Sequence, residues 1–287
     1  MKLHRTGPFL HAYRLLPHRL LNRAAARLTA FRHPRFLVDA AVRSWIRRGR
    51  IDMAEFEDRR FDSIDDFFLR RVRDGARPIG EGFVSPVDGI VVASGEISPN
   101  RVLSIKGRPL SVDRMVNGGR HSLSLDDYEG GKAVTIFLTP DGYHRIHMPA
   151  AGTIRSSQFI PGRFHPQNED ALLSLPRVYE KNERLILRCR LPERSTAGME
   201  FILVLVGASL IGGIELKALP RSQWAKADGP RPLDLQCNKG DEIAHFRFGS
   251  TVVVLLPRTA DIAEMPVEGT RVRMGETLLQ LSGADAQ

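Results

Sequence analysis

The residue types that activate a nucleophile occur at predicted turns and strand ends of this chain. Asp88 lies in SPVDGIV, His144 and His147 lie in DGYHRIHMP, and Ser250 lies in RFGSTVVVLL. An imidazole that is oriented by a carboxylate can deprotonate a serine hydroxyl near neutral pH. The chain order Asp, His, Ser is acceptable because geometry, and not order, defines such a triad. The sequence therefore predicts a nucleophilic group built from Asp88, Ser250 and one of the two histidines.

Each of these motifs also has an ordinary structural interpretation. An Asp-Gly pair between apolar residues is typical of a hairpin turn, and the Gly-Ser-Thr of the last motif also suits a turn. The two histidines face opposite sides if they lie on one strand, and no third ligand is evident, so a metal site is not favoured. No G-x-S-x-G motif occurs in the chain, so the usual setting of a serine hydrolase is missing.

The elements that must position these residues are mainly β from Phe83 onward. Short runs rich in Val and Ile, such as GIVVASGEI, KAVTIFL, RLILRCRL and TVVVLL, are separated by turn residues. The longest apolar stretch, residues 201–214, is shorter than the roughly 20 residues of a membrane span, so we expect two buried strands broken at residues 207–209. Recurrent Pro-x-x-Gly turns predict an α+β fold, mainly β, with a compact barrel-like or sandwich-like catalytic domain over residues 76–287.

The first 75 residues form a different region, which is basic and helical. Residues 1–50 carry twelve Lys or Arg and a single acid, whereas the remainder is nearly neutral. Apolar residues at spacings of three and four run beside a stripe of arginines: Leu20, Ala24, Leu28 and Phe31 beside Arg19, Arg23 and Arg27. A second helix is expected over residues 36–50, and a short one within 60–72 with Asp62 or Ser63 as its N-cap. Basic amphipathic helices of this kind lie in the headgroup plane of an anionic membrane.

Three other interpretations of this basic arm compete with membrane contact. A mitochondrial presequence is rich in serine, but residues 1–50 hold only Ser44. The Leu and Phe content is high for an arm that binds RNA, so no nucleic-acid partner is predicted. Helices that merely pack on the catalytic domain are the main alternative to a membrane-binding role.

Motifs along the chain resemble those of the phosphatidylserine decarboxylases, a family of pyruvoyl-dependent membrane enzymes. They are SPVDG, YHRIHMP, NER at 182–184, VGASLIGGIE at 206–215 and KGDEIAHFRFGSTVV at 239–253, preceded by the basic helices. The resemblance covers roughly residues 35–280, with the motifs in the family's order. It implies that Ser250, deprotonated through His147 and Asp88, attacks the carbonyl of Gly249. The chain would then divide into a β chain, 1–249, and an α chain, 250–287, whose first residue becomes a pyruvoyl group.

The same resemblance implies a reaction and its participants. The pyruvoyl group forms a Schiff base with the amine of phosphatidylserine, and the products are phosphatidylethanolamine and carbon dioxide. His144 is assigned to decarboxylation, and Asn168 to the substrate pocket. The sequence departs from the family pattern at His165 and Gln167, which precede Asn168, and at Phe248, which replaces a leucine. The resemblance further implies a homodimer on the cytoplasmic face of a bacterial inner membrane, which offers the anionic surface.

Two other functions fit the same residues. A membrane-associated serine hydrolase or acyltransferase could use Ser250, His147 and Asp88 on an external ester. A basic-armed binding module without enzymatic activity would use the Asp-Gly and Gly-Ser pairs as turns alone. The decarboxylase differs from both because it alone predicts a cut between residues 249 and 250.

Overall fold

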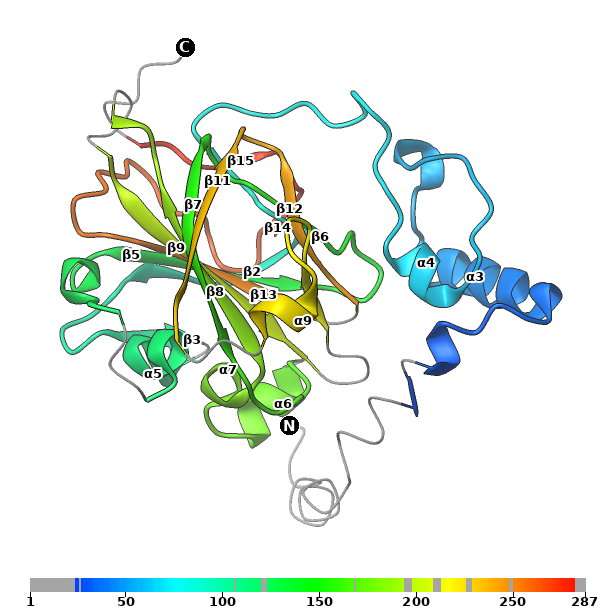
Figure 1. The fold of residues 1–287 in the computed structure, drawn as a ribbon, viewed down its shortest axis with the longest axis horizontal. Coiled ribbons are helices and arrows are strands. Elements are labelled where there is room, and N and C mark those ends of the chain that lie inside the picture. Colours follow the sequence, from blue (N-terminus) through cyan, green and yellow to red (C-terminus); the bar gives the residue numbers. More distant parts are fainter. Residues whose placement is uncertain are drawn as a thin grey trace.

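The structure is a computed structural model that describes residues 24–25, 27–105, 107–119, 123–167, 169–193, 198–208, 213–225, 229–247 and 250–281. Most of the first predicted helix lies outside these residues, as do Asn168, Phe248 and Gly249. Figure 1 shows a β-rich body from which the helices of the N-terminal region extend to one side. The chain is mainly β from Phe83 onward, as the sequence predicts.

In the described part of the chain, antiparallel strands form one large sheet and three small ones. The large sheet has eight strands, in spatial order β11 (Arg231–Cys237), β7 (Gly152–Ile160), β8 (Arg184–Arg190), β9 (Glu200–Gly207), β13 (Ser250–Leu256), β5 (Lys132–Leu138), β2 (Gly89–Glu96) and β14 (Arg271–Val272). A three-stranded sheet has the order β10 (Ile214–Leu216), β12 (Glu242–Phe246) and β6 (Arg145–His147). The two remaining sheets pair β1 (Phe83–Val84) with β15 (Thr277–Leu279), and β3 (Val102–Ile105) with β4 (Arg108–Ser111).

Among the described residues, every helix except α3 is short. They are α3 (Arg35–Gly49), α4 (Ile64–Phe68), α5 (Val112–Asn117), α6 (Glu169–Ser174), α7 (Val178–Lys181) and α9 (Arg221–Trp224), with 3-10 turns η1 (Met53–Glu55) and η2 (Asp126–Tyr128). The predicted helices over residues 36–50 and within 60–72 are α3 and α4. Ser63 is the N-cap of α4, because its hydroxyl accepts a hydrogen bond from the backbone N–H of Asp66 at 3.0 Å.

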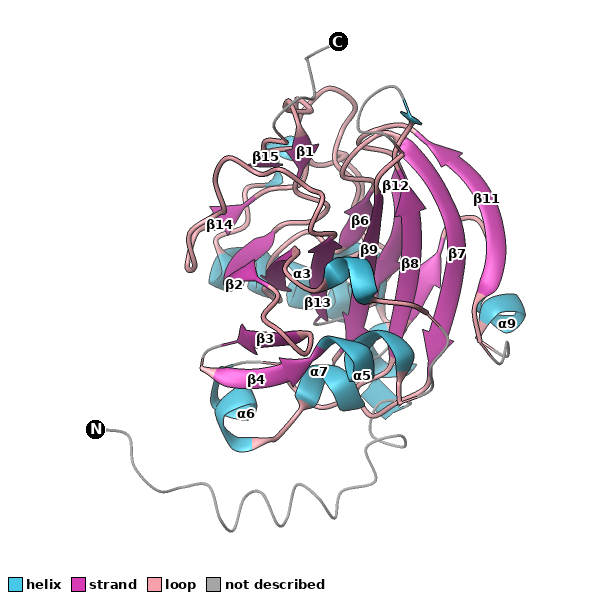
Figure 2. Cartoon of the chain, turned by 90° about the vertical axis from the view of Figure 1, so that its left-hand side faces the viewer, coloured by secondary structure: helices cyan, strands magenta, loops and turns pink. Residues whose placement is uncertain are grey.

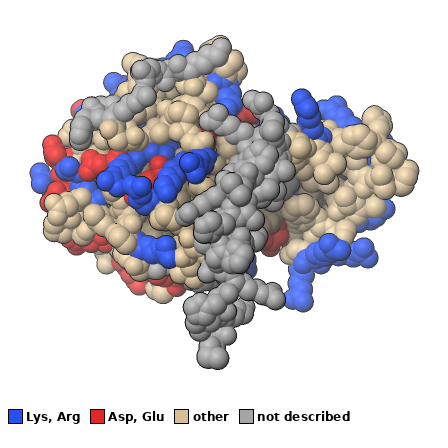
Figure 3. Space-filling model, turned by 90° about the horizontal axis from the view of Figure 1, so that it is seen from below, with Lys and Arg blue, Asp and Glu red and all other residues tan. Residues whose placement is uncertain are grey.

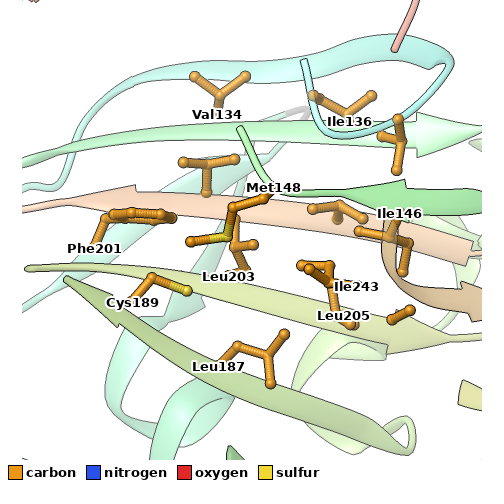
Figure 4. Packing of buried hydrophobic residues seen from close by; sticks show 14 of the residues in the cluster. Val134, Ile136, Ile146, Met148, Leu187, Cys189, Phe201, Leu203, Leu205 and Ile243 are labelled. Carbon is orange, nitrogen blue, oxygen red and sulfur yellow. The ribbon is translucent and has the colours of Figure 1, made fainter. Parts of the chain in front are cut away.

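The main core lies between the large sheet and the three-stranded sheet. β13 runs in the middle of the large sheet, hydrogen-bonded to β9 on one side and β5 on the other, and all seven of its residues are buried. Figure 4 shows side chains from both sheets meeting in this core, including Leu203 and Leu205 of β9 and Ile146 of β6. The apolar stretch 201–214 begins in β9, which ends at Gly207 where the break was predicted; residues 209–212, most of the second predicted strand, lie outside the described residues, and Ile214 is the first residue of β10.

A second apolar layer covers the other face of the large sheet. Alternate residues of β9 and β13, among them Val204, Val206 and Val253, pack there against α5, α7 and the β3–β4 hairpin. Figure 2 shows these helices and the hairpin gathered at one side of the sheet. Because both faces of β13 are covered, its sequence from Val252 to Leu256 is a continuous apolar run without polar alternation.

The barrel part of the predicted fold is wrong for the described residues, whereas the packing of two sheets is sandwich-like. The large sheet is open, with β11 and β14 as its edges. β11 contains Pro232, which has no backbone N–H to donate, and its residues alternate between more and less exposed. β14 has two residues. Two such edges cannot supply the continuous hydrogen-bonded pairing that closes a barrel.

Candidate active site

Strand pairing brings the three predicted catalytic segments to one end of β5. Ser250 opposes Leu138, the last residue of β5, and the chain then turns into β6, which ends at His147. The backbone N–H of His147 donates to the carbonyl of Pro86 at 2.9 Å, which places β6 beside the bend that holds Asp88. The site is therefore assembled from segments that are up to 164 positions apart in the sequence, from Pro86 to Ser250.

Asp88 lies between strands of different sheets, so the hairpin interpretation of its Asp-Gly pair is wrong. β1 pairs with β15, whereas β2 pairs with β5 and β14. Gly89 is required for another reason: a Cβ atom there would lie 2.5 Å from the carbonyl oxygen of Phe137 in β5. The glycine permits this close approach of the two backbones, and the approach fixes Asp88 at the end of the sheet.

The Asp88 carboxylate is held by a bidentate ion pair. Nη1 and Nη2 of Arg77 donate to its two oxygens at 2.5 and 3.0 Å, and the backbone N–H of Met274 donates at 2.8 Å. The Arg77 side chain is 6% exposed and also binds Glu55. Bidentate charge-assisted pairs of this kind are strong and directional, so Asp88 is rigidly placed.

The His147 ring has a hydrogen-bond partner at both nitrogens. Its Nδ1 lies 2.7 Å from the carbonyl oxygen of Gly240, and its Nε2 lies 2.8 Å from the hydroxyl oxygen of Tyr143. Burial lowers the pKa of His147 below its usual value, which favours the neutral ring. A carbonyl can only accept, so Nδ1 carries the proton and Nε2 accepts from Tyr143. Within the described residues, no hydrogen bond joins His147 directly to Asp88 or to Ser250.

His144 lies in a different environment three residues earlier. Its ring stacks on Phe68 of α4 with 3.9 Å between ring centroids, and its Nδ1 lies 3.0 Å from the carbonyl oxygen of Gly142. Complete burial lowers the pKa of His144 to about 3, so the ring is neutral at physiological pH. Its Nε2 is buried without a hydrogen-bond partner among the described residues. The structure thus leaves a basic nitrogen on His144 unused.

Ser250 is the second site residue with an unused polar atom. The residue is 0% exposed, and its Oγ has no hydrogen-bond partner among the described residues. Burying a hydroxyl without a partner costs free energy, and such groups in folded proteins call for an explanation. The predicted Gly-Ser-Thr turn is a strand from its serine onward, since Ser250 and Thr251 are the first residues of β13.

The segment that follows α4 covers the turn between β5 and β6. Nη2 of Arg70, a residue 1% exposed, donates to the carbonyls of Asp141 and Gly142 at 2.6 and 2.8 Å. Arg145 donates from Nε and Nη2 to the carbonyl of Leu69 at 3.0 and 2.6 Å. The N-terminal region therefore supplies one wall of the candidate site.

Sequence reasoning missed the residues that surround the predicted triad. Arg77, Tyr143 and Phe68 each contact a predicted site residue, yet none lies in a pattern that indicates chemistry by itself. Tyr143 offered the best available signal, because it is adjacent to His144 within the histidine motif.

Comparisons with known proteins agree with the motifs. A sequence model described as phosphatidylserine decarboxylase matches residues 64–280, which is more than half of the chain. The chain belongs to the phosphatidylserine decarboxylase family. Curated phosphatidylserine decarboxylase proenzymes are similar over nearly the whole length. The protein from Psychrobacter cryohalolentis is 31% identical over 278 residues, covering 94% of this chain and 97% of the relative.

Two further relatives show the same extent of similarity. The phosphatidylserine decarboxylase proenzyme of Pseudomonas fluorescens Pf-5 is 34% identical over 290 residues, covering 94% of this chain and 96% of its own. That of Bordetella pertussis is 33% identical over 286 residues, covering 94% and 93%. Because these matches extend beyond the family region of residues 64–280, the N-terminal region is shared with these relatives as well.

Proposed function

We propose that this chain cuts itself between Gly249 and Ser250 and that Ser250 becomes the pyruvoyl group of the mature enzyme. As a member of its family, the chain is a carboxy-lyase made as a proenzyme, and it converts phosphatidylserine to phosphatidylethanolamine and carbon dioxide. The observation that carries the proposal is the Ser250 hydroxyl, which is fully buried and has no hydrogen-bond partner among the described residues. A hydroxyl kept in this costly state is explained if it is a reactant.

The self-cleavage uses groups at the end of β5. The Ser250 hydroxyl loses its proton toward His147, and its Oγ attacks the carbonyl carbon of Gly249. The C–N bond between the two residues breaks as the Ser250 nitrogen takes the proton from His147, and an ester between Gly249 and Oγ replaces it. Loss of the Ser250 α-proton then breaks the Cβ–Oγ bond, which releases the Gly249 carboxylate and leaves dehydroalanine. Water hydrolyses that residue to a pyruvoyl group and ammonia.

Asp88 and His147 have separate tasks in this step. His147 is neutral because burial lowers its pKa, so it can accept a proton at neutral pH. The Asp88 carboxylate, which Arg77 fixes at the end of the sheet, is proposed to stabilise the positive charge that His147 gains in this step. We propose this group, together with Gly249 and Ser250, as the machinery of maturation.

His144 is the proposed acid–base group for decarboxylation. The pyruvoyl group, once formed from Ser250, would supply a carbonyl for the substrate amine and take up the electrons released with carbon dioxide. Decarboxylation consumes one proton from solvent, which must reach the substrate α-carbon, and the unused, buried Nε2 of the neutral His144 ring can accept this proton and pass it on. Asn168 stays a proposed pocket residue, since it lies outside the described residues.

The fold is suited to hold the new chain end in place after cleavage. β13 keeps its hydrogen bonds to β5 and β9, and Val252–Leu256 is completely buried. The α chain also contributes β14 and β15, which pair with β2 and β1 of the β chain. The two chains therefore share one core, and the pyruvoyl end cannot diffuse from the site.

The N-terminal region, residues 1–75, is the proposed membrane-binding part. Large apolar side chains are exposed there: Leu28 at 72%, Phe31 at 53%, Phe36 at 67% and Leu37 at 53%. Figure 3 shows Lys and Arg side chains along the edges of this lobe. No helix in the described part of the chain is long and apolar enough to cross a bilayer. Exposed apolar groups beside basic ones favour peripheral binding to an anionic surface.

We place the enzyme on the cytoplasmic face of a bacterial inner membrane, where anionic lipids and its substrate occur together. The basic arm is the feature that supports this location. A homodimer is expected from the family resemblance.

A denaturing gel of the purified protein tests the proposed function. The native protein should run as two fragments, 1–249 and 250–287, and the smaller one should react with hydroxylamine and resist Edman degradation. Ser250→Ala should stay whole and inactive, whereas Ser157→Ala, at a buried serine of β7, should be cut like the native protein. Cleavage of Ser250→Ala would overturn the proposal, and an intact chain that hydrolyses esters would favour a serine hydrolase.

A further inference from the structure

The basic nitrogen of His147 is covered by a phenol. In the neutral ring the lone pair of Nε2 points along the 2.8 Å hydrogen bond from the Tyr143 hydroxyl, because Nδ1 is committed to the Gly240 carbonyl. A proton added to Nε2 must lie in this same direction, between the ring and the Tyr143 oxygen. The nearest proton on that line is the hydroxyl proton of Tyr143 itself.

The Tyr143 side chain is held where it is. It is 2% exposed and forms a small buried cluster with Phe56 and Met274. The guanidinium of Arg77 lies 5.2 Å from the centre of its ring. A ring fixed on these sides cannot leave His147 without disturbing the cluster and the Arg77–Asp88 pair.

Backbone contacts place Tyr143 near the segment that leads to Ser250. The backbone N–H of Phe246 donates to the carbonyl of His144 at 3.0 Å, four residues before Ser250. On the other side, Ser250 opposes Leu138, five residues before Tyr143. No described hydrogen bond of the Ser250 hydroxyl has to break before it donates a proton to another group.

We propose that Tyr143 relays the proton from Ser250 to His147 during self-cleavage, an inference that rests on the proposed function. The Tyr143 oxygen receives the proton of Ser250 as its own proton passes to Nε2 of His147. The Ser250 Oγ–H bond breaks as Oγ bonds to the carbonyl carbon of Gly249. Tyr143 is neutral before and after the transfer, and His147 carries the positive charge.

The electrostatic surroundings of Tyr143 suit a relay. Burial raises the pKa of Tyr143 above its usual value, with a smaller contribution from Glu242, so the phenol keeps its proton and acts as a donor. A phenolate intermediate is disfavoured there, which requires both protons to move together. In this scheme the Tyr143 phenol donates one proton while it accepts another, and it does not ionise to a phenolate.

Tyr143→Phe tests the relay, because it removes the hydroxyl and keeps the ring. Full-length protein made by cell-free synthesis should form fragments 1–249 and 250–287 at least a hundredfold more slowly than the native chain. Tyr128→Phe is the matched control: that tyrosine is also buried, and its hydroxyl donates to a backbone carbonyl, that of Glu200, at 3.3 Å. The control should be cut at the native rate, and both variants should show similar thermal unfolding temperatures.

The pH dependence tests the hydrogen bond between Tyr143 and His147 on which the relay depends. Cleavage needs neutral His147, so the rate rises with pH through the pKa of His147. The hydrogen bond from Tyr143 stabilises the neutral ring. Removing it should raise the pKa of His147, so the rise in cleavage rate should move to higher pH. The other charged groups near the ring are unchanged: Glu242, which raises the pKa of His147, and Arg145 and Arg77, which lower it. Asp88 stays bound to Arg77 in the variant.

A solvent isotope experiment supplies the decisive result. If two protons move in the rate-limiting step, the native cleavage rate depends on the deuterium fraction of the solvent along a curve. If one proton moves, the dependence is a straight line. Native-rate cleavage of Tyr143→Phe, or a straight line for the native chain, would overturn the relay while Ser250→Ala still stays whole. If Ser250→Ala is cut, the proposed function itself fails.

Discussion

At the scale of single residues, Arg77 connects the candidate site to the N-terminal region. It donates to both oxygens of Asp88 and also to Glu55, which follows α3. Its guanidinium lies 5.8 Å from the ring centre of Phe56 and 5.2 Å from that of Tyr143. One nearly buried cation therefore contacts two carboxylates, and removing it takes from Asp88 its bidentate partner, whereas Glu55 keeps its ion pair with Arg273.

Arg77→Gln should destabilise the protein more than the loss of an ordinary surface ion pair. With the largely buried Asp88 carboxylate left without its bidentate partner, we expect the free energy of unfolding to fall by about 3 kcal/mol. Urea unfolding in the Ser250→Ala background measures this on a single uncut chain. Arg101→Gln is the control, because Arg101 also binds several acids but at a more exposed place, and its loss should be under about 1 kcal/mol. Equal losses in the two variants would contradict the role given to Arg77.

At the scale of elements, α3 packs with one side and is exposed on the other. Its Val38 and Val42 are buried in a cluster with Phe61 and Phe67, so the helix is attached to the segment that forms the wall of the site. Its first turn exposes Phe36 and Leu37. The alternative that this helix merely packs on the domain explains the buried side and not the exposed one.

Phe36→Ser with Leu37→Ser tests the exposed side of α3. Both side chains are more than half exposed, so their transfer into lipid should contribute about 2 kcal/mol together, and the double variant should bind anionic vesicles at least tenfold more weakly. Sedimentation with phosphatidylglycerol vesicles measures this binding, which should also weaken as salt is added.

The matched control removes exposed apolar groups outside the arm. Leu173 and Val267 are 49% and 70% exposed, and replacing both by serine should leave vesicle binding unchanged. If the control weakens binding as much as the arm variant does, the arm is not the membrane-binding surface.

At the scale of the whole molecule, the packing of sheets and helices buries histidines in the neutral state. Burial lowers the pKa values of His144, His147 and His245, and that of His144 falls to about 3. In the unfolded chain these rings bind protons below the ordinary pKa of 6.5. The unfolded state then holds more protons than the folded state, so stability falls as pH decreases below 6.5.

Mild acid should therefore destabilise the Ser250→Ala protein before its carboxylates titrate. At pH 5.5, one unit below the ordinary histidine pKa, His144 alone should lower the free energy of unfolding by about 1.4 kcal/mol. His144→Gln should flatten the dependence of urea unfolding on pH between 5 and 6.5. His33→Gln, at an exposed histidine, should keep the native slope. An unchanged slope in His144→Gln would show that His144 does not bind a proton on unfolding.

The sequence by itself determined the local structure and the residue types of the site. Val- and Ile-rich runs predicted β2, β5, β8 and β13, because a strand buried on one or both faces needs such side chains wherever its partners lie. The Ser63 cap and the end of β9 at Gly207 were equally local signals. Whether the sheet closes into a barrel is not encoded locally. The open edges depend on which strands pair with β11 and β14.

Only the tertiary structure decided which groups contact the predicted residues. Asp88 is bound to Arg77 and not to His147, and His147 is bound to Tyr143 and the Gly240 carbonyl. Gly240 lies 93 positions from His147, and that contact follows from the pairing of β6 with β12. Local periodicity encodes which side of a segment is buried, whereas the partner of a buried polar group depends on distant segments packing together.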